Sequence, residues 1–96
     1  MDPALAIAHA AGLPYSGLRD VTPDARLLRY VPPRVAREQK VVPVVLVGDT
    51  LKVASATAHP DLHAVTDAFP GLTIDLVVAP EPEMDAVLGR LEARVP

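Results

Sequence analysis

Two apolar runs separated by Gly48-Asp49 are the feature that most constrains the fold of this chain. The runs cover Val41–Val47 and Leu51–Ala56, and both have the length of β-strands. Gly tolerates the positive φ that a type II′ turn requires at its first loop position, so the segment predicts a two-residue hairpin. The first run is apolar on both faces, which is typical of a strand covered on both sides. Pro43 cannot donate to a ladder, so this strand should begin beyond Pro43 or lie at a sheet edge.

A helix, a third strand and a last helix are predicted after the hairpin. Pro60 suits the first turn of a helix, and the apolar stripe Leu62, Val65 and Phe69 at helical spacing extends that helix to Phe69. Alternating apolar and polar residues predict a strand over Leu72–Val78. The order strand, helix, strand implies that this strand pairs in parallel with the second hairpin strand. The last helix should cover Glu83–Arg94 and bury one face, made of Met84, Val87, Leu88 and Leu91.

The N-terminal third predicts short helices interrupted by prolines and glycines. Asp2 and Thr22 are expected to cap two of these helices, and Gly12 suits the end of the first. Leu5 and Ala8 should form the buried side of the first helix, and the stretch 13–18 should be irregular or briefly extended. The three predicted helices are Pro3–Ala11, Ala25–Val31 and Arg34–Gln39.

Together, these elements predict an α/β (α+β) fold. Short N-terminal helices precede a small β-β-α-β-α unit with a three-stranded mixed sheet. At 96 residues, of which 50% are hydrophobic, the chain is long enough to bury one core, so we expect a single domain over residues 1–96.

Composition argues against several classes of function. Two Tyr, one Phe and no Trp leave few rings for stacking on bases, and a net charge of −3 provides no basic field, so we expect no nucleic-acid partner. The chain has no Cys, hence no disulfide, thiolate zinc site or cysteine nucleophile. No apolar run approaches the ~20 residues of a membrane span, and Ala4–Leu13 lacks the cationic flank of a signal peptide. We therefore expect a soluble cytoplasmic protein without direct membrane insertion.

His59, His63 and Asp67 recur every four residues and could share one helix face as metal ligands. Such spacing more often indicates a polar, solvated helix face. A zinc site would also need another ligand that points at the same metal position. We therefore predict no metal site.

Catalytic machinery is not recognisable in the sequence. Ser16, Ser55 and Thr57 lack the glycine pattern of a nucleophile elbow. Gly48 and Gly71 are isolated turn glycines, and there is no dinucleotide-binding glycine motif and no Walker lysine. We predict no catalytic residues, no cofactor and no enzymatic activity.

One basic cluster stands out between residues 26 and 40. Two of its members, Arg34 and Arg37, lie three residues apart on a short predicted helix. Guanidinium groups bind carboxylates or anionic ligands bidentately, although a solvated helix face is the more frequent reading of such a cluster. The predicted partner- or anion-binding residues are Arg26, Arg29, Arg34 and Arg37, with Lys40 beside them.

An ordered set of short motifs resembles the N-terminal domain of type II secretion and type IV pilus assembly ATPases. The resemblance covers nearly the whole chain and depends on the order and spacing of the motifs, because no single one is diagnostic. The motifs are Gly12-Leu13-Pro14-Tyr15, the run from Asp24 to Pro32, Val35-Ala36-Arg37, Val41-Val42-Pro43, Leu51-Lys52-Val53-Ala54, Pro60, and Ala64-x-x-Asp67.

This resemblance implies a small cytoplasmic adaptor domain that docks the assembly ATPase on the cytoplasmic region of a membrane-anchored partner. The chain would then reach the membrane only through that partner, and we expect the partner to contact the region Asp2–Gln39. Some members of the wider family bind cyclic di-GMP through motifs that begin Arg-Leu-Gly. Here Ala10-Ala11-Gly12 stands where the later motif could begin, so its Arg is missing. Cyclic di-GMP binding is the alternative function.

Overall fold

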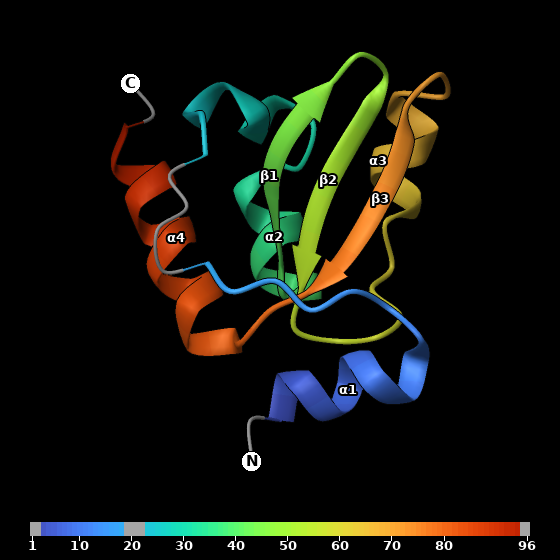
Figure 1. Cartoon of the computed structure of the whole chain (residues 1–96). Coiled ribbons are helices and arrows are strands. Elements are labelled where there is room, and N and C mark those ends of the chain that lie inside the picture. Colours follow the sequence, from blue (N-terminus) through green and yellow to red (C-terminus); the bar gives the residue numbers. More distant parts are fainter. Residues whose placement is uncertain (1–2, 19–22, 95–96) are drawn as a thin grey trace.

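The computed structural model describes residues 3–18 and 23–94, and their elements follow the predicted order (Figure 1). Four α-helices, one 3-10 helix and a three-stranded mixed sheet make up these described residues, which confirms the predicted α+β fold. The elements are α1 (Pro3–Ala11), the 3-10 helix η1 (Ala25–Arg29), α2 (Pro33–Gln39), β1 (Val41–Val47), β2 (Thr50–Ser55), α3 (His63–Ala68), β3 (Thr73–Val78) and α4 (Glu81–Arg94).

The sheet has the order β1-β2-β3, with β2 in the centre. Strands β1 and β2 pair antiparallel across the tight turn, where Gly48 has a φ of +60° as the hairpin prediction requires. Strands β2 and β3 pair in parallel without a register shift, which confirms the pairing predicted from the strand–helix–strand order. In Figure 1, α2 and α3 lie behind the sheet, α4 lies beside β1, and α1 lies beyond the carboxyl ends of β2 and β3.

Strand β1 differs in part from the prediction. It lies at an edge of the sheet, as one of the two alternatives for Pro43 requires, but it does not begin beyond Pro43: this residue pairs with Val53 inside the strand. The register shifts between Pro43 and Val45, which marks a bulge or similar irregularity. The strand is also not covered on both sides throughout, because Val45 is 43% exposed and Val47 is 70% exposed.

The core lies between the sheet and the helices, and α4 contributes the face that the sequence predicts. Met84, Val87, Leu88 and Leu91 are all at most 4% exposed. They join one cluster with the middle of the sheet and with η1 and α2. Val65 supplies the buried side chain of α3, while Leu62 and Phe69 are only partly buried. Two of the three residues in the predicted α3 stripe therefore lie at the margin of the core.

Helix α3 is shorter than predicted. It begins at His63 rather than Pro60, because the residues before it make other hydrogen bonds. The N–H of Asp61 donates to the side-chain oxygen of Gln39 at 2.9 Å, and the Asp61 carboxylate accepts the N–H of His63 at 3.1 Å. These contacts hold the chain outside the helix at Asp61, so the prediction that Pro60 starts the helix is wrong.

The N-terminal helices also depart from the prediction in detail. The segment predicted as an α-helix over Ala25–Val31 is a 3-10 helix that ends at Arg29, and Asp24 caps it. The predicted cap Thr22 lies outside the described residues, as does Asp2. Helix α1 buries Ala4 and Ala8, whereas Leu5, which lies at helical spacing from Ala8, is 50% exposed.

The core can be tested with two leucine truncations. Leu91 is 1% exposed within the main cluster, whereas Leu5 is 50% exposed on α1. We expect Leu91→Ala to lower the free energy of unfolding by about 2–5 kcal/mol, because it removes buried methyl groups and leaves a cavity. The matched change Leu5→Ala should cost less than about 0.5 kcal/mol. Urea denaturation followed by circular dichroism measures both, and equal losses for the two variants would contradict this assignment of the core.

Candidate functional site

The predicted arginines lie on η1 and α2, and most of them bind carboxylates of the same chain. Arg26 forks onto its helix cap, with 2.7 Å between Arg26 Nη2 and Asp24 Oδ2. Arg34 reaches Glu38 one turn further along α2, with 3.3 Å between Nε and Oε1. The side chains of Arg26 and Arg34 are 88% and 86% exposed. Such exposed pairs contribute little to stability, and both guanidinium groups remain accessible to a partner.

A second set of ion pairs joins α2 to α4. Arg37 binds Glu92 in a bidentate manner, with 2.9 Å from its Nε to Oε1, and Lys40 Nζ lies 3.0 Å from Glu81 Oε1. Hydrogen bonding to these carboxylates raises the pKa of both cations, and Asp85 adds a smaller attraction to each. Lys40 has a left-handed backbone conformation, with φ of 57°, where α2 ends and β1 begins. Arg37 and Lys40 therefore fasten α2 to α4 across the surface.

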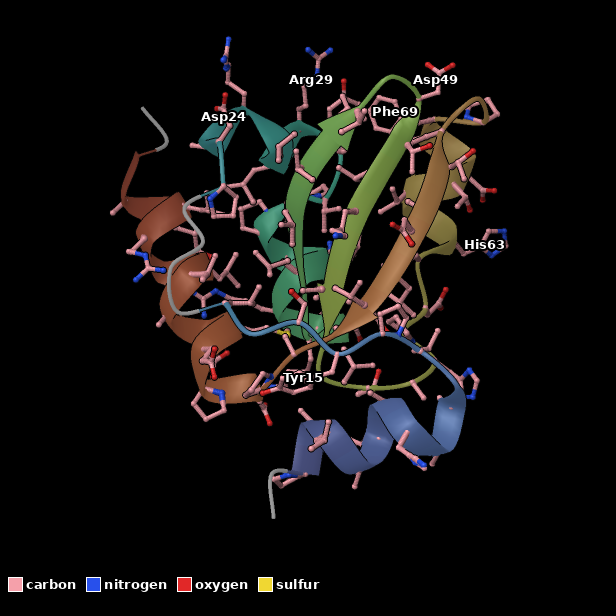
Figure 2. All side chains as sticks on the ribbon, in the orientation of Figure 1. Tyr15, Asp24, Arg29, Asp49, His63 and Phe69 are labelled. Carbon is pink, nitrogen blue, oxygen red and sulfur yellow. The ribbon has the colours of Figure 1, made fainter. Side chains whose placement is uncertain are left out.

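Arg29 differs from the other predicted residues. Within the described part of the chain it has no carboxylate partner, and its guanidinium carbon lies 5.4 Å from the centre of the Tyr30 ring. Tyr30 in turn packs on Phe69, with ring centres 4.9 Å apart and planes tilted by 58°. Figure 2 shows Arg29, Phe69 and the hairpin residue Asp49 at the same end of the molecule. Arg29 thus presents an exposed positive charge beside a small aromatic cluster.

The structure does not bring His59, His63 and Asp67 together as metal ligands. His59 precedes α3, so it does not share a helix face with His63. His63 Nε2 lies 3.1 Å from Asp67 Oδ2, and the two side chains are 76% and 70% exposed. Across residues 3–18 and 23–94, no group of three or more His, Cys, Asp or Glu side chains is placed to hold a metal ion.

Ser55 and Ser16, two of the hydroxyl residues considered in the sequence, make hydrogen bonds that stabilise the local backbone. Ser55 is fully buried at the end of β2, where its Oγ donates to the carbonyl of Thr57 at 2.7 Å and accepts the N–H of Thr57 at 3.0 Å. The N–H of Ser16 donates to the carbonyl of Val78 at 2.8 Å. Ser55 therefore tightens the turn after β2, and the backbone of Ser16 ties its segment to β3.

The segment after α1, predicted as irregular or briefly extended, connects α1, β3 and α4 through hydrogen bonds. Tyr15 makes a parallel bridge to Val78, so this segment adds a short stretch to the outer edge of β3. Gly12 has the positive φ of +67° expected at the end of α1. Leu18 is buried, and its N–H donates to Glu83 Oε1 at 2.8 Å. The role of Glu83 was missed because its partner lies 65 residues away in the sequence.

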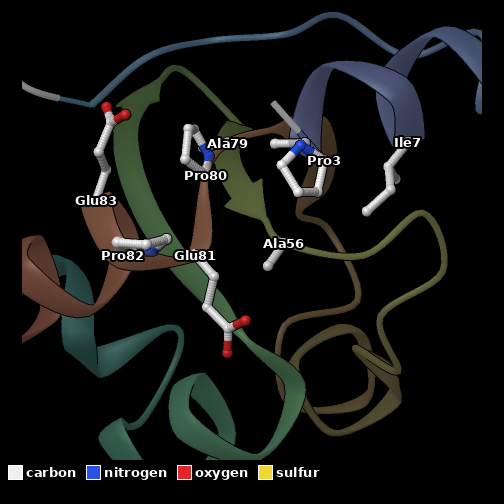
Figure 3. A pocket seen from close by; sticks show the side chains of 9 residues that line it. Pro3, Ile7, Ala56, Ala79, Pro80, Glu81, Pro82 and Glu83 are labelled. Carbon is white, nitrogen blue, oxygen red and sulfur yellow. The ribbon is translucent and has the colours of Figure 1, made fainter. Parts of the chain in front are cut away.

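A pocket of about 550 Å³ lies between α1 and the start of α4. Figure 3 shows Pro3 and Ile7 of α1 on one side and the segment Ala79–Glu83 on the other, with Ala56 between them. The lining is mainly aliphatic, and the carboxylates of Glu81 and Glu83 point in opposite directions, toward Lys40 and Leu18 respectively. This pocket suits an apolar side chain better than a charged ligand.

Among the described residues, one face of the sheet is covered only at one end. Cross-strand partners share a face, and the row Val42–Ala54–Val77 is buried beneath the main cluster. The next two rows on the same face carry exposed or partly exposed side chains. We call these two rows the open face; its residues are Val45, Lys52 and Asp75 in one row and Val47, Thr50 and Thr73 in the other.

Comparison with known proteins identifies the family of this fold. The family model described as the MshEN domain matches residues 11–95. The chain belongs to the MshEN domain family. The match covers all of the described sheet, η1, α2, α3 and α4, whereas nearly all of α1 precedes it.

Solved structures agree with this assignment. A structure of MshE with cdg matches at a TM-score of 0.73 and 25% identity, covering 88% of this chain and 62% of that one. The N-terminal domain of XpsE matches in two crystal forms, with TM-scores of 0.75 and 0.70, identities of 23% and 21%, and coverage of 93% and 92% of this chain. The MshEN domain described here thus spans less than two thirds of each of these structures, 62% to 64%.

These matches confirm the resemblance drawn from the sequence to the N-terminal domain of secretion and pilus assembly ATPases. No curated protein matches the chain. Within the described residues, none of the helices has the length and apolar character needed to cross a bilayer.

The Asp24 cap makes a prediction about acid titration. The hydrogen bonds from Arg26 lower the pKa of Asp24 from its ordinary 3.8 to about 2. Because the folded-state pKa is depressed, the cap contributes stability above the unfolded-state pKa and loses it as the pH falls through the folded-state pKa. We expect the Asp24 carboxyl carbon to titrate near pH 2 in an NMR experiment, and at a higher pH in Arg26→Ala, which removes the guanidinium hydrogen bonds but keeps the backbone N–H that also lowers this pKa. A midpoint near 3.8 in the unmodified chain would contradict the ion pair.

Proposed function

We propose that this MshEN domain, over residues 1–96, is a non-catalytic docking module in the cytoplasm. Its partner is a cytoplasmic region of a membrane-anchored protein of a type II secretion or type IV pilus system. The observation that carries the proposal is the set of exposed guanidinium groups on η1 and α2, in a domain of the family found in MshE. The partner surface that fits this set is acidic.

Exchange of ion pairs supports this proposal. Among the described residues, Arg26 and Arg34 are held by exposed carboxylates on the same short segments, and such exposed pairs contribute little to stability. A partner carboxylate can replace the internal one at little cost. Arg29 needs no such exchange, since its exposed charge lies over the Tyr30 ring and meets no carboxylate in the described part of the chain. Arg29 is therefore the residue best placed to meet an acidic partner first.

A charge reversal tests the docking face. We expect Arg29→Glu to slow association with the partner's cytoplasmic region by about threefold or more, because charges at the rim of an interface mainly steer association. Arg34→Glu should act in the same direction. Raised salt should slow the association of the unmodified chain without changing its circular dichroism spectrum. Surface plasmon resonance at two salt concentrations measures these rates.

The matched control is Arg90→Glu, which reverses the same charge on α4, where Arg90 lies beside Leu18 and Ala86. Its association rate should stay close to that of the unmodified chain. Thermal melts of every variant check that the fold is intact. Arg37 is left unchanged because its reversal would also break the pair with Glu92. Equal effects of Arg29→Glu and Arg90→Glu would place the contact elsewhere on the domain.

Cyclic di-GMP is the competing ligand, since MshE has been solved with cdg. Against this alternative, the position where the motif would place Arg is occupied by Ala10, which is exposed on α1 next to Ala11 and has no group that could bind a phosphate. We expect isothermal titration with cyclic di-GMP to show no binding in the micromolar range. Micromolar binding that weakens in Arg34→Ala or Arg37→Ala would reverse the order of the two functions.

A further inference from the structure

Over part of β3, the backbone groups on its outer edge have no hydrogen-bond partner among the described residues. The N–H of Thr73 donates to the carbonyl of Asp49 at 2.8 Å, and the N–H of Ala79 donates to the carbonyl of Ser55 at 2.9 Å. The odd-numbered residues of β3 therefore direct their N–H and C=O groups toward β2. Since these groups alternate along a strand, those of Ile74 and Leu76 point away from β2.

Val78 shows what this outer edge can bind. Its N–H donates to the carbonyl of Pro14 and its carbonyl accepts the N–H of Ser16, both at 2.8 Å. The chain thus already places a short parallel segment against the end of β3. That segment does not continue along the strand, because the residues before Leu13 turn into α1. Within residues 3–18 and 23–94, no hydrogen bond reaches the outward N–H and C=O of Ile74 and Leu76.

The opposite edge of the sheet is less suited to pairing. Strand β1 contains Pro43, which has no N–H to donate, and its register shifts before Val45. Both features are known to discourage strand addition at an edge. Residues 73–76 of β3 contain no proline and no register shift. The edge of β3 is therefore the one at which an added strand would find an uninterrupted run of backbone groups.

We infer that the outer edge of β3, along Ile74–Leu76, binds an extended segment of a partner protein as a fourth strand. The occupant carries a Lys or Arg opposite Asp75 on its outer side. This carboxylate is exposed on the open face, and although Lys52 is its neighbour on β2, it forms no ion pair with Lys52 or with any other described residue. A second copy of the chain fits less well. It would place its own Asp75 near this edge, and each copy as a whole carries a net charge of −3, so the two copies repel each other. The inference rests on the proposed docking function and names a second contact for it.

Residue-resolved amide hydrogen exchange tests this contact without any substitution. In the free chain, the amides of Ile74 and Leu76 should exchange faster than those of Asp75 and Val77, which pair with β2. When the 15N-labelled chain is saturated with the cytoplasmic region of the membrane-anchored partner, the Ile74 and Leu76 amides should slow by about tenfold or more, while Asp75 and Val77 change much less. Heteronuclear NMR spectra recorded after transfer to heavy water measure all four rates.

The possible outcomes separate this inference from the docking function. If the partner binds and Ile74 and Leu76 exchange as in the free chain, the strand contact is wrong and the docking function stands. If the partner's cytoplasmic region does not bind, both are wrong. If Ile74 and Leu76 become protected at high protein concentration without the partner, and the mass in solution doubles, the edge binds a second copy and the assigned occupant is wrong.

Two matched charge reversals test the role assigned to Asp75 at the edge of β3. Asp75→Lys should weaken binding of the partner by about threefold, because it places like charges opposite each other across the new strand pair. Asp67→Lys makes the same charge change on the exposed surface of α3 and should leave the affinity unchanged. Thermal melts confirm that both variants fold. Equal affinities of Asp75→Lys and Asp67→Lys would overturn the basic residue assigned to the occupant.

Discussion

The register of the β1–β2 hairpin determines which side chains of this domain are inside and which are available to a partner. The two-residue turn pairs Val47 with Thr50, and a slip of one residue would move every side chain of a strand to the other face. With the observed register, Leu51 and Val53 of the central strand are fully buried against the helices. The same register puts Thr50 and Lys52 on the open face.

The register of the central strand β2 also determines which side chains of β3 lie on each face of the sheet. β3 pairs with β2 without a shift, so its faces are set by those of β2, and Asp75 shares the open face with Lys52. The irregularity between Pro43 and Val45 corrects the alternation of β1, which returns Val45 to the open face. The exposed valines are thus a consequence of one turn and one irregularity in the hairpin.

Much of this fold could be predicted because the signals are local. The hairpin was marked by one Gly-Asp pair between two apolar runs, and the buried face of α4 by helical spacing within one helix. The start of α3 could not be found in this way, because the N–H of Asp61 is held by Gln39, 22 residues earlier. Propensity favours a helix that starts at Pro60, and the tertiary hydrogen bond overrides it. The partner of Leu18 was hidden for the same reason.

The charged surface was predicted in composition but not in arrangement. The sequence shows a cluster of cations between residues 26 and 40, whereas the carboxylates that bind Arg37 and Lys40 come from α4, more than 40 residues later. These two pairs join secondary-structure elements, so Arg37 and Lys40 serve the fold as well as any partner. Arg26 and Arg34 pair within their own segments, and Arg29 has no acidic partner in the described chain. The cations of the predicted cluster therefore differ in how readily they could bind a second protein, because some are engaged in ion pairs between helices and others are not.

The two ends of the sheet have different physical characters, and this difference bears on how a partner can bind. At the carboxyl end of β3, Val78 packs with Ala4 and Ala8 of α1 and pairs with the segment around Tyr15, while Glu83 holds Leu18 nearby. This end is filled by the chain itself. Toward the hairpin, no described segment covers the open face or the outer edge at Ile74 in this way, and Arg29 lies at the same end as the hairpin turn (Figure 2). A strand bound there would form directional backbone hydrogen bonds with β3. The arginines instead attract acidic groups over a longer distance, and this attraction does not require a precise geometry. Affinity and rate of association can therefore be supplied by different parts of one small domain.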